Sequence, residues 1–310
     1  MLVIFIIGFV LMEPALENLE QWLNLNEDEQ NAVVRDLEEW LGDEYAHRYT
    51  LSYANQPSFR VPTFEHLPTG LELNLIGGGE FNMGLSVPEE KAFRSLIEQE
   101  GLDKEYFFGF IDMMRPVHSV RVQPFLMSRL PMLNSFAREH LELDLDEYIS
   151  DYEVDVDYEE QLLPATLSRE QMNQLMAKFG FSLPSEAQWE YAYRGRTSTL
   201  FYWGDRLIDE DKIALAEFSD PQKCRQAANP FGLVGMAVGE WCADSYRPDY
   251  SNASGNDRPV AGEPPYVVRG GAAMLSPWQG CGEWVTCVSA VRQAAEAEDV
   301  QAGRFVKVLE

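Results

Sequence analysis

Positive charge is scarce in this chain. Its 310 residues include 24 Lys and Arg against 51 Asp and Glu, which gives a formal net charge of −27. Proteins that bind nucleic acid gather Lys and Arg into clusters that contact phosphates, and anionic membranes attract the same residues. The sequence has no such cluster, so we expect neither nucleic acid nor anionic membrane as a partner. The charge favours a protein partner with a basic surface.

Cysteine and histidine are also few. The four cysteines are Cys224, Cys242, Cys281 and Cys287, and the four histidines are scattered, without a CxxC or HExxH motif. This excludes a disulfide scaffold and a histidine-rich metal site. Because chains with few cysteines suit a reducing compartment, we expect a cytoplasmic location. We expect Cys242 in the core and Cys224 as a thiol in a polar loop.

Hydrophobic runs long enough to cross a membrane are absent. The apolar start, residues 1–12, falls short of the roughly 20 residues that span a bilayer, so no transmembrane span is expected. It also lacks the basic region and cleavage site of an ordinary signal peptide. This start indicates either a start codon placed too early, with Met12 as the true first residue, or a short anchor or atypical signal. Export and membrane association through it therefore stay open.

Residues 13–70 are expected to form a short helical extension and a linker. Apolar residues recur at helical spacing over 13–48, Asn26 followed by Glu29 predicts a capping box, and Gly42 is placed to end a helix. Three prolines and a glycine mark 52–70 as a linker or an extended edge.

The character of the chain changes from residue 71. The segment LELNLIGGGEFNMG predicts a strand, a turn and a strand, and 115–140 predicts another strand and a helix that begins near Asn134. Ser168 and Ser185 are placed to cap two further helices, and Gln188 stands three residues after Ser185. Aromatic residues in these segments, with Trp189 and Trp241 foremost, are expected to fill the core.

The order of motifs from residue 71 to 308 resembles that of the formylglycine-generating enzyme family, also called sulfatase-modifying factors. The matching segments are LIGGGEFNMG, PVHSVRVQPFLM, LPMLNSF, SLPSEAQWEYAYRG, FYWGD, NPFGLVGMAVGEWCAD, VVRGGAA, VSAVR and AGRF. The resemblance implies an α+β, loop-rich, C-type-lectin-like fold over 71–310. Relative to the family, residues 85–114 and 139–160 are insertions.

The resemblance also implies where an oxidase would carry its chemistry. Oxidase members bind Cu(I) with two cysteines after the RGG motif and convert a substrate cysteine to formylglycine, because thiolates suit this soft ion. Counted from Gly271, those positions hold Leu275 and Gly280. A shifted loop would offer Cys281 and Cys287 instead, six residues apart. We therefore expect no cofactor, with copper at these two cysteines as the alternative.

A calcium site is also weakened in this chain. Family members often bind Ca²⁺ around a DMxGNVWEW segment, where oxygen ligands suit a hard cation. Here the segment reads GMAVGEW, and Glu240 is the acidic residue that remains. Glu240 is thus a weak calcium candidate, with burial in an ion pair as the plainer interpretation.

Three segments offer aromatic side chains to a partner. The 139–160 insertion holds eleven Asp and Glu, no Lys or Arg, and Tyr148, Tyr152 and Tyr158. It is interpreted either as a solvated segment or as a docking surface for a basic partner. The 85–114 insertion is expected to form one helix and an aromatic loop, with Phe107 and Phe108 costly to expose without a contact. In variable proteins that share this fold, the binding residues follow RGG, which corresponds to 272–302 here and makes Trp278 and Trp284 candidate exposed aromatics.

The sequence therefore predicts a non-catalytic binding or accessory protein on this scaffold, which recognises a protein partner or ligand. The alternative is a copper-dependent formylglycine-generating oxidase. The oligomeric state is not predicted.

Overall fold

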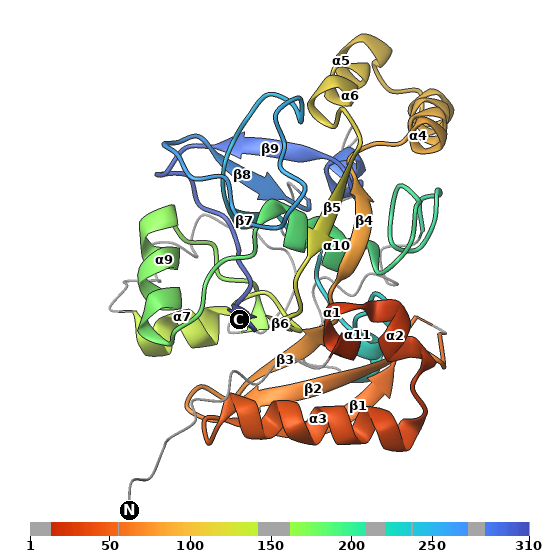
Figure 1. Ribbon diagram of the computed structural model, residues 1–310. Coiled ribbons are helices and arrows are strands. Elements are labelled where there is room, and N and C mark those ends of the chain that lie inside the picture. The colour runs from red at the N-terminus through yellow and green to blue at the C-terminus, as the bar shows by residue number, and fades with distance from the viewer. Residues whose placement is uncertain are drawn as a thin grey trace, which may run out of the picture.

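The computed structural model describes residues 14–54, 56–141, 162–208, 221–236, 238–271 and 283–309 (Figure 1). The apolar start and most of the acidic 139–160 insertion lie outside these ranges. None of the helices in the described ranges has the length and apolar character that a membrane crossing needs.

The chain begins with three helices, α1 (Pro14–Glu17), α2 (Leu19–Asn24) and α3 (Glu27–Leu41). Asn18 caps α2, and the predicted capping box of α3 is confirmed, because Asn26 and Glu29 each accept the other's backbone N–H. Gly42 follows α3 at φ +79, a conformation that favours glycine. The caps explain why this helix begins and ends where it does.

A five-stranded antiparallel sheet lies behind α3, with the strands in the order β1-β2-β3-β6-β10. In Figure 1, α3 runs along the outer side of β1 and β2. Val33, Val34 and Leu37 of α3 are buried in the same core cluster as Phe64 and Leu73. The strands are β1 (Tyr45–Ser52), β2 (Arg60–His66), β3 (Leu71–Ile76), β6 (Phe125–Ser128) and β10 (Val306–Val308).

The structure differs from the prediction over residues 45–70. A helical pattern was predicted as far as residue 48, and a linker or an extended edge over residues 52–70. Instead, β1 begins at Tyr45, and β2 pairs with a strand on each of its two sides. Prolines usually exclude a central strand because they lack an N–H. Pro62 is tolerated because β2 pairs with β3 only over Thr63–His66, so Pro62 has β1 alone as its ladder partner.

The turn after β3 leads into a second sheet rather than back along the first. Strand β4 (Gly79–Met83) pairs with β5 (His118–Val122), whereas β3 pairs with β2 and β6. Both predicted strands are present, but they form no hairpin. A Cβ on Gly78 would lie 2.8 Å from the Val122 carbonyl oxygen, so only glycine lets the chain pass this point.

A third sheet and several helices complete the domain. The predicted helices α9 and α10 begin with capping boxes from Ser168 and Ser185, with Gln171 and Gln188 as the reciprocal partners. The sheet order is β7-β8-β9. The bounds are α7 (Asn134–His140), α9 (Arg169–Lys178), α10 (Glu186–Arg194), α11 (Pro221–Ala227), β7 (Glu240–Ser245), β8 (Tyr266–Arg269) and β9 (Arg292–Ala295). Cys224 lies buried in α11 rather than in a loop.

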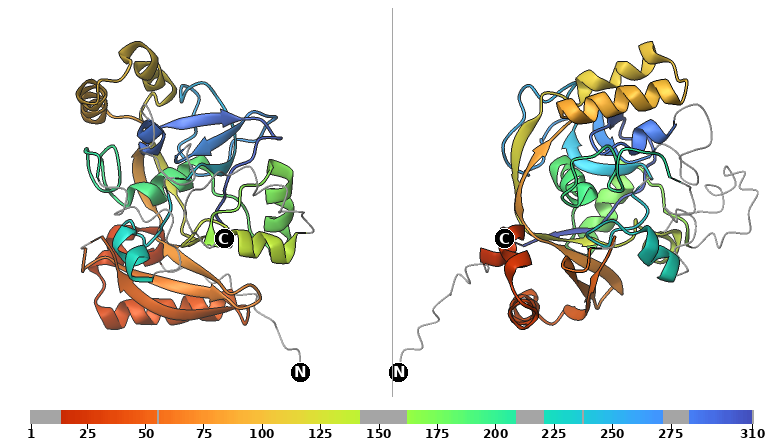
Figure 2. Two further views of the ribbon diagram at one scale, coloured as in Figure 1. Left: turned by 180° about the vertical axis from the view of Figure 1, so that it is seen from behind. Right: turned by 90° about the vertical axis from the view of Figure 1, so that its right-hand side faces the viewer.

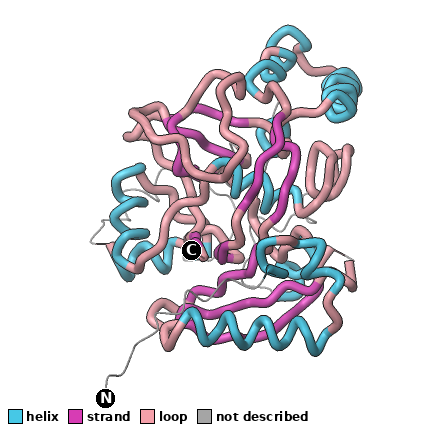
Figure 3. Tube along the Cα trace, in the orientation of Figure 1, coloured by secondary structure: helices cyan, strands magenta, loops and turns pink. Residues whose placement is uncertain are grey.

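The 85–114 insertion forms α4 (Val87–Gln99), α5 (Lys104–Phe108) and α6 (Phe110–Met113), so the expected aromatic loop is helical. It stands at one end of the molecule in all views (Figures 1 and 2). Its inner side belongs to a second hydrophobic cluster, shared with the 3₁₀ helix η3 (Glu283–Cys287). Loops make up much of the remaining upper half (Figure 3), in agreement with the predicted loop-rich α+β fold.

Candidate functional site

Helix α10 carries a buried ion network that joins it to the third sheet. Arg269, at the end of β8, donates to Glu186 at 2.9 Å and to Glu190 at 2.5 Å. Arg292 of β9 donates to the other Glu186 oxygen at 2.7 Å. All four side chains are at most 6% exposed. Burial alone would raise the pKa of Glu190, but Arg194 and Arg269 hold it below its usual value.

The network continues into the 85–114 insertion. Arg194, at the end of α10, pairs with Glu190 at 2.8 Å and with Glu89 of α4 at 2.6 Å. It also donates to the Gly84 carbonyl oxygen at 3.0 Å. Since Glu89 and Arg194 are both about 5% exposed, this pair fixes the insertion to the domain.

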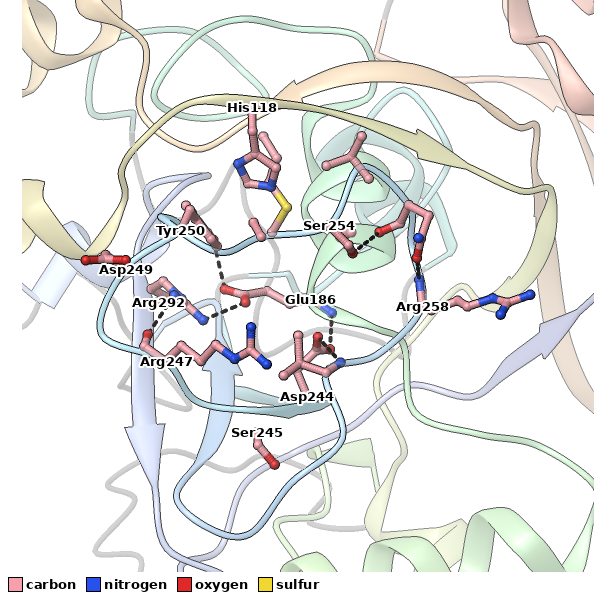
Figure 4. Close-up of a pocket in the computed structure, with 16 residues that line it drawn as sticks. His118, Glu186, Asp244, Ser245, Arg247, Asp249, Tyr250, Ser254, Arg258 and Arg292 are labelled. Atoms are coloured by element: carbon pink, nitrogen blue, oxygen red, sulfur yellow. Dashed lines mark hydrogen bonds and ion pairs between the residues drawn. The ribbon is translucent and has the colours of Figure 1, made fainter.

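A small polar pocket opens beside this network (Figure 4). Its floor is Glu186, which accepts from the Tyr250 hydroxyl at 2.9 Å. Asp244 lines it and accepts the backbone N–H groups of Glu186 and Val260 at 2.7 and 2.9 Å. Burial and then the Glu186 charge raise the pKa of Asp244 to about 6. The pocket encloses about 40 Å³, which suits a water molecule rather than an organic substrate.

The weak calcium candidate, Glu240, is committed to an ion pair. Its two carboxylate oxygens accept from Nε of Arg304 at 2.9 and 3.0 Å, and one also accepts from the Trp189 indole at 2.9 Å. Both charged groups are fully buried. The donor set at Glu240 therefore does not fit Ca²⁺, which needs several free oxygen ligands. Across the described ranges, no three His, Cys, Asp or Glu side chains gather as metal ligands.

Of the two candidate copper ligands, the structure describes Cys287, which lies in apolar surroundings. The side chain is fully buried at the end of η3, within the second hydrophobic cluster. Burial raises the pKa of its thiol to about 12, although Thr286 opposes the shift. Copper binding needs the thiolate, and in the absence of a metal this apolar environment favours the protonated thiol. Cys281 lies outside the described residues, and Cys242 is fully buried, as predicted for a core residue.

The aromatic residues predicted to contact a partner differ in how far they are buried. Trp284 was expected to be exposed, but it is 4% exposed because it packs against Phe201 in the second cluster. Phe107 is also buried, and Phe108 is half-buried under the Arg94 guanidinium, 4.4 Å from the ring centroid. The exposed ring of this insertion is Tyr106 at 63%. Trp278, Tyr148, Tyr152 and Tyr158 lie outside the described residues.

A larger cavity, here called the α2–β4 cavity, lies between α2, β4, the start of α4 and the end of α10. It encloses about 390 Å³, within the usual range for small-ligand sites. Arg196 and Glu20 lie at its wall and pair at 2.6 Å with side chains 40% and 68% exposed. Such an exposed pair stabilises by about 0.2–1 kcal/mol. Arg196 has φ +74, and this left-handed conformation costs a non-glycine residue about 1–2 kcal/mol.

Comparison with known proteins agrees with this architecture. The model of the family described as the sulfatase-modifying factor enzyme 1-like domain matches residues 59–304. The chain belongs to this family. Its sulfatase-modifying-factor domain includes β2, which the sequence motifs had left outside.

A solved structure shows the same fold. PvdO from Pseudomonas aeruginosa superposes with a TM-score of 0.53 at 20% sequence identity, over 80% of this chain and 98% of that chain. Variable protein 1 of Treponema denticola gives 0.49 at 14% identity, over 77% of this chain and 96% of that one.

Among curated proteins, the serine/threonine-protein kinase pkn1 of Chlamydia caviae is 35% identical over 80 residues. These residues are 25% of this chain and 13% of the kinase, so the chain spans a small part of that relative.

Sequence reasoning missed the ion network and the α2–β4 cavity. Part of the network carries a visible signal, since Glu190 and Arg194 stand four residues apart on one helix. The rest joins residues that are distant in the chain, such as Arg269 and Glu186, so no local pattern announces it.

Proposed function

We propose that this member of the sulfatase-modifying-factor family is a non-catalytic binding or accessory protein, and that its partner is a protein with a basic surface. One observation carries the non-catalytic part. Cys287, the candidate ligand that the structure describes, is fully buried in the second hydrophobic cluster, so copper and a protein substrate would have to reach it through packed apolar side chains. The positions where oxidases of the family carry their cysteines hold Leu275 and Gly280.

Charge and surface support the binding part of the proposal. A chain with a net charge of −27 attracts basic proteins and speeds their approach. The 85–114 insertion offers a rigid, projecting contact, because the Glu89–Arg194 pair anchors its root and Tyr106 is exposed on its second helix.

An anaerobic Cu(I) titration against a competing chelator tests the proposal. We would compare the wild-type protein with Cys281→Ala, Cys287→Ala and, as a matched control, Cys224→Ala, which removes another buried thiol. We expect no stoichiometric tight binding in any of the four proteins. One copper per chain, lost in the first two variants and kept in the control, would overturn the proposal. That outcome would support a copper-dependent oxidase acting on a cysteine of a protein substrate.

A further inference from the structure

Strand β4 has a second edge that its own sheet leaves unpaired. It pairs with β5 without a bulge, and Glu80 stands opposite Arg121. The N–H of Arg121 points away from β4, because it donates to the Gly255 carbonyl oxygen at 3.0 Å. In an antiparallel ladder, two opposite residues either exchange both hydrogen bonds or both turn away from each other. Glu80 therefore directs its own N–H and C=O away from β5.

The two ends of β4 follow the same alternation. Gly78 exchanges backbone hydrogen bonds of 2.7 Å with α1 and α2, and the N–H of Gly84 donates to the Glu190 carboxylate of α10 at 2.9 Å. Because backbone groups alternate in direction along a strand, Glu80 and Asn82 present theirs to the same side as these glycines. Within the part of the chain that the structure describes, neither residue has a partner for its N–H or C=O.

The α2–β4 cavity lies along this unpaired stretch of edge, since residues 79–82 all line it. Gly78 and Gly84, whose backbone groups are occupied, stand about 20 Å apart at the rise of a β-strand, which leaves room for an extended segment of about three residues. Figure 1 shows α1 and α2 at one end of β4, and the start of α4 and the end of α10 form further wall. With helices around it, this edge is closed to the edge of another sheet and open to a single extended chain.

The charges in the cavity wall are balanced. Glu20 pairs with Arg196 at 2.6 Å, and Glu89 pairs with Arg194 at 2.6 Å. The Glu80 carboxylate accepts a hydrogen bond from a side chain of β5. A charged ligand would therefore gain little here. The main-chain N–H and C=O groups of an extended peptide, in contrast, match the unpaired groups of β4.

Phe81 adds a preference for one side chain of such a peptide. Its ring lines the cavity and packs edge-to-face on Tyr191, with 5.3 Å between the ring centroids. The Tyr191 hydroxyl donates to the Gly77 carbonyl oxygen at 3.0 Å, so the two rings form a fixed apolar surface. On an added strand, the residue opposite Phe81 would place its side chain beside this surface. Aromatic and β-branched side chains pair favourably across strands, which favours valine or isoleucine at that position.

We infer that β4 binds an extended, uncharged segment of the partner protein as an added strand in the α2–β4 cavity, with an apolar side chain opposite Phe81. The backbone groups of Glu80 and Asn82 supply the hydrogen bonds, and Phe81 supplies the selectivity. This inference rests on the proposed function for the existence of a protein partner, but the edge itself is tested without that partner.

Amide hydrogen exchange, followed by NMR on the free full-length protein, is the first test. The N–H groups of Glu80 and Asn82 should exchange much faster than those of Phe81 and Met83, which face β5. Equal protection of all four would overturn the inference. It would show that another segment of this chain, or a second copy, already occupies the edge.

The second test uses acetyl-Thr-Val-Thr-methylamide as the probe. Its matched control is the depsipeptide with the same side chains, in which ester oxygens replace the N–H groups. The peptide should bind saturably and slow the exchange of Glu80 and Asn82. The depsipeptide should bind at least about 5-fold more weakly, which corresponds to the loss of two hydrogen bonds. Equal affinity of the two compounds would overturn the inference.

Asn82→Pro tests the edge from the side of the protein. It removes an N–H that the ladder with β5 does not use, and proline is tolerated at such positions of an edge strand. Saturable binding of the peptide should be lost. Glu80→Gln is the control, because it changes a side chain on the same edge and leaves the backbone as it is, so the affinity should stay unchanged.

Circular dichroism checks that both variants are folded. Binding that survives in folded Asn82→Pro, or that is lost in Glu80→Gln, would overturn the inference. If Asn82→Pro does not fold, the exchange pattern and the depsipeptide comparison on the wild-type protein still decide. None of these results bears on the copper titration, so failure of the added strand and failure of the proposed function are distinguishable.

Discussion

Fully buried arginines determine much of the energetics at the scale of single residues. Arg269, Arg292 and Arg304 are each at most 2% exposed, and each has a carboxylate partner. Removing one partner of such a pair leaves a charge without compensation in a medium that solvates it poorly. These positions are therefore more sensitive to conservative substitution than the hydrophobic core around them.

The Glu240–Arg304 pair gives the sharpest test. Glu240→Gln should lower the free energy of unfolding by about 3–5 kcal/mol, because the Arg304 guanidinium then stays buried and charged. Chemical denaturation measures this loss. The double variant Glu240→Leu with Arg304→Met should lose less than the sum of the single variants, because it leaves no orphaned charge. Additive losses would show that the two residues act independently.

Asp244 predicts a pH dependence with a definite sign. Its pKa is raised from 3.8 to about 6, so the folded state holds the proton more tightly than the unfolded state. Its stabilising contribution is complete below pH 3.8 and is lost as the pH rises through 6. The difference corresponds to about 3 kcal/mol. We would measure the free energy of unfolding of the wild type and of Asp244→Asn at each pH and subtract the second from the first. This difference should fall by about 3 kcal/mol between pH 4 and pH 7. A difference that is flat with pH would contradict the raised pKa.

At the scale of elements, the attachment of the insertion depends on one buried pair at its root. Glu89→Gln should lower the free energy of unfolding by about 1–3 kcal/mol, since it weakens a charged hydrogen bond to Arg194 without removing the Glu190 partner. Hydrogen exchange should speed up in α4 and stay unchanged in α3.

The matched control for this prediction lies on the same helix. Glu98 pairs with Lys104 at 2.8 Å, but both side chains are more than half exposed. Glu98→Gln should therefore change stability by less than about 1 kcal/mol. If the two substitutions had equal effects, the pair at the root would not be the anchor.

The elements also show what could be predicted from the sequence. Helices α3, α9 and α10 were predicted at their start residues, because a capping Asn or Ser is a local signal, strengthened in α3 and α10 by Glu or Gln three residues later. Strands β1 and β2 were missed, because their place in the sheet depends on partners and not on their own composition. Pro62 in particular is acceptable only because of where the β2–β3 ladder begins. The site was missed for the same reason, since Arg196 and Glu20 pair although they are 176 residues apart in the sequence.

At the scale of the whole molecule, net charge opposes the compact state. The excess negative charges that give the net charge of −27 repel one another. Salt screens this repulsion, because the Debye length shortens from about 30 Å at 0.01 M to about 8 Å at 0.15 M ionic strength. We expect the midpoint of thermal unfolding to rise between these concentrations of NaCl. A gain of about 1 kcal/mol corresponds to a rise of about 2–4 °C in the midpoint for a domain of roughly 150–250 residues.

Tetramethylammonium chloride should act as NaCl does, because screening depends on ionic strength and not on the identity of the cation. Calorimetry at matched ionic strength checks this. A larger rise in CaCl₂ alone would indicate a specific cation site and would contradict the screening explanation.

The five-stranded sheet has a consequence for the order in which the chain folds. Its last strand, β10, pairs with β6, and Arg304 just before it donates to the Ser128 carbonyl oxygen across 176 residues. Closing so long a loop costs conformational entropy before any contact compensates for it. Until that happens, one edge of β6 presents unpaired backbone groups to any other extended chain. The β6–β10 pairing is thus both the slowest to form and the place at which two partly folded chains would first associate. Aggregation during refolding should therefore grow with protein concentration.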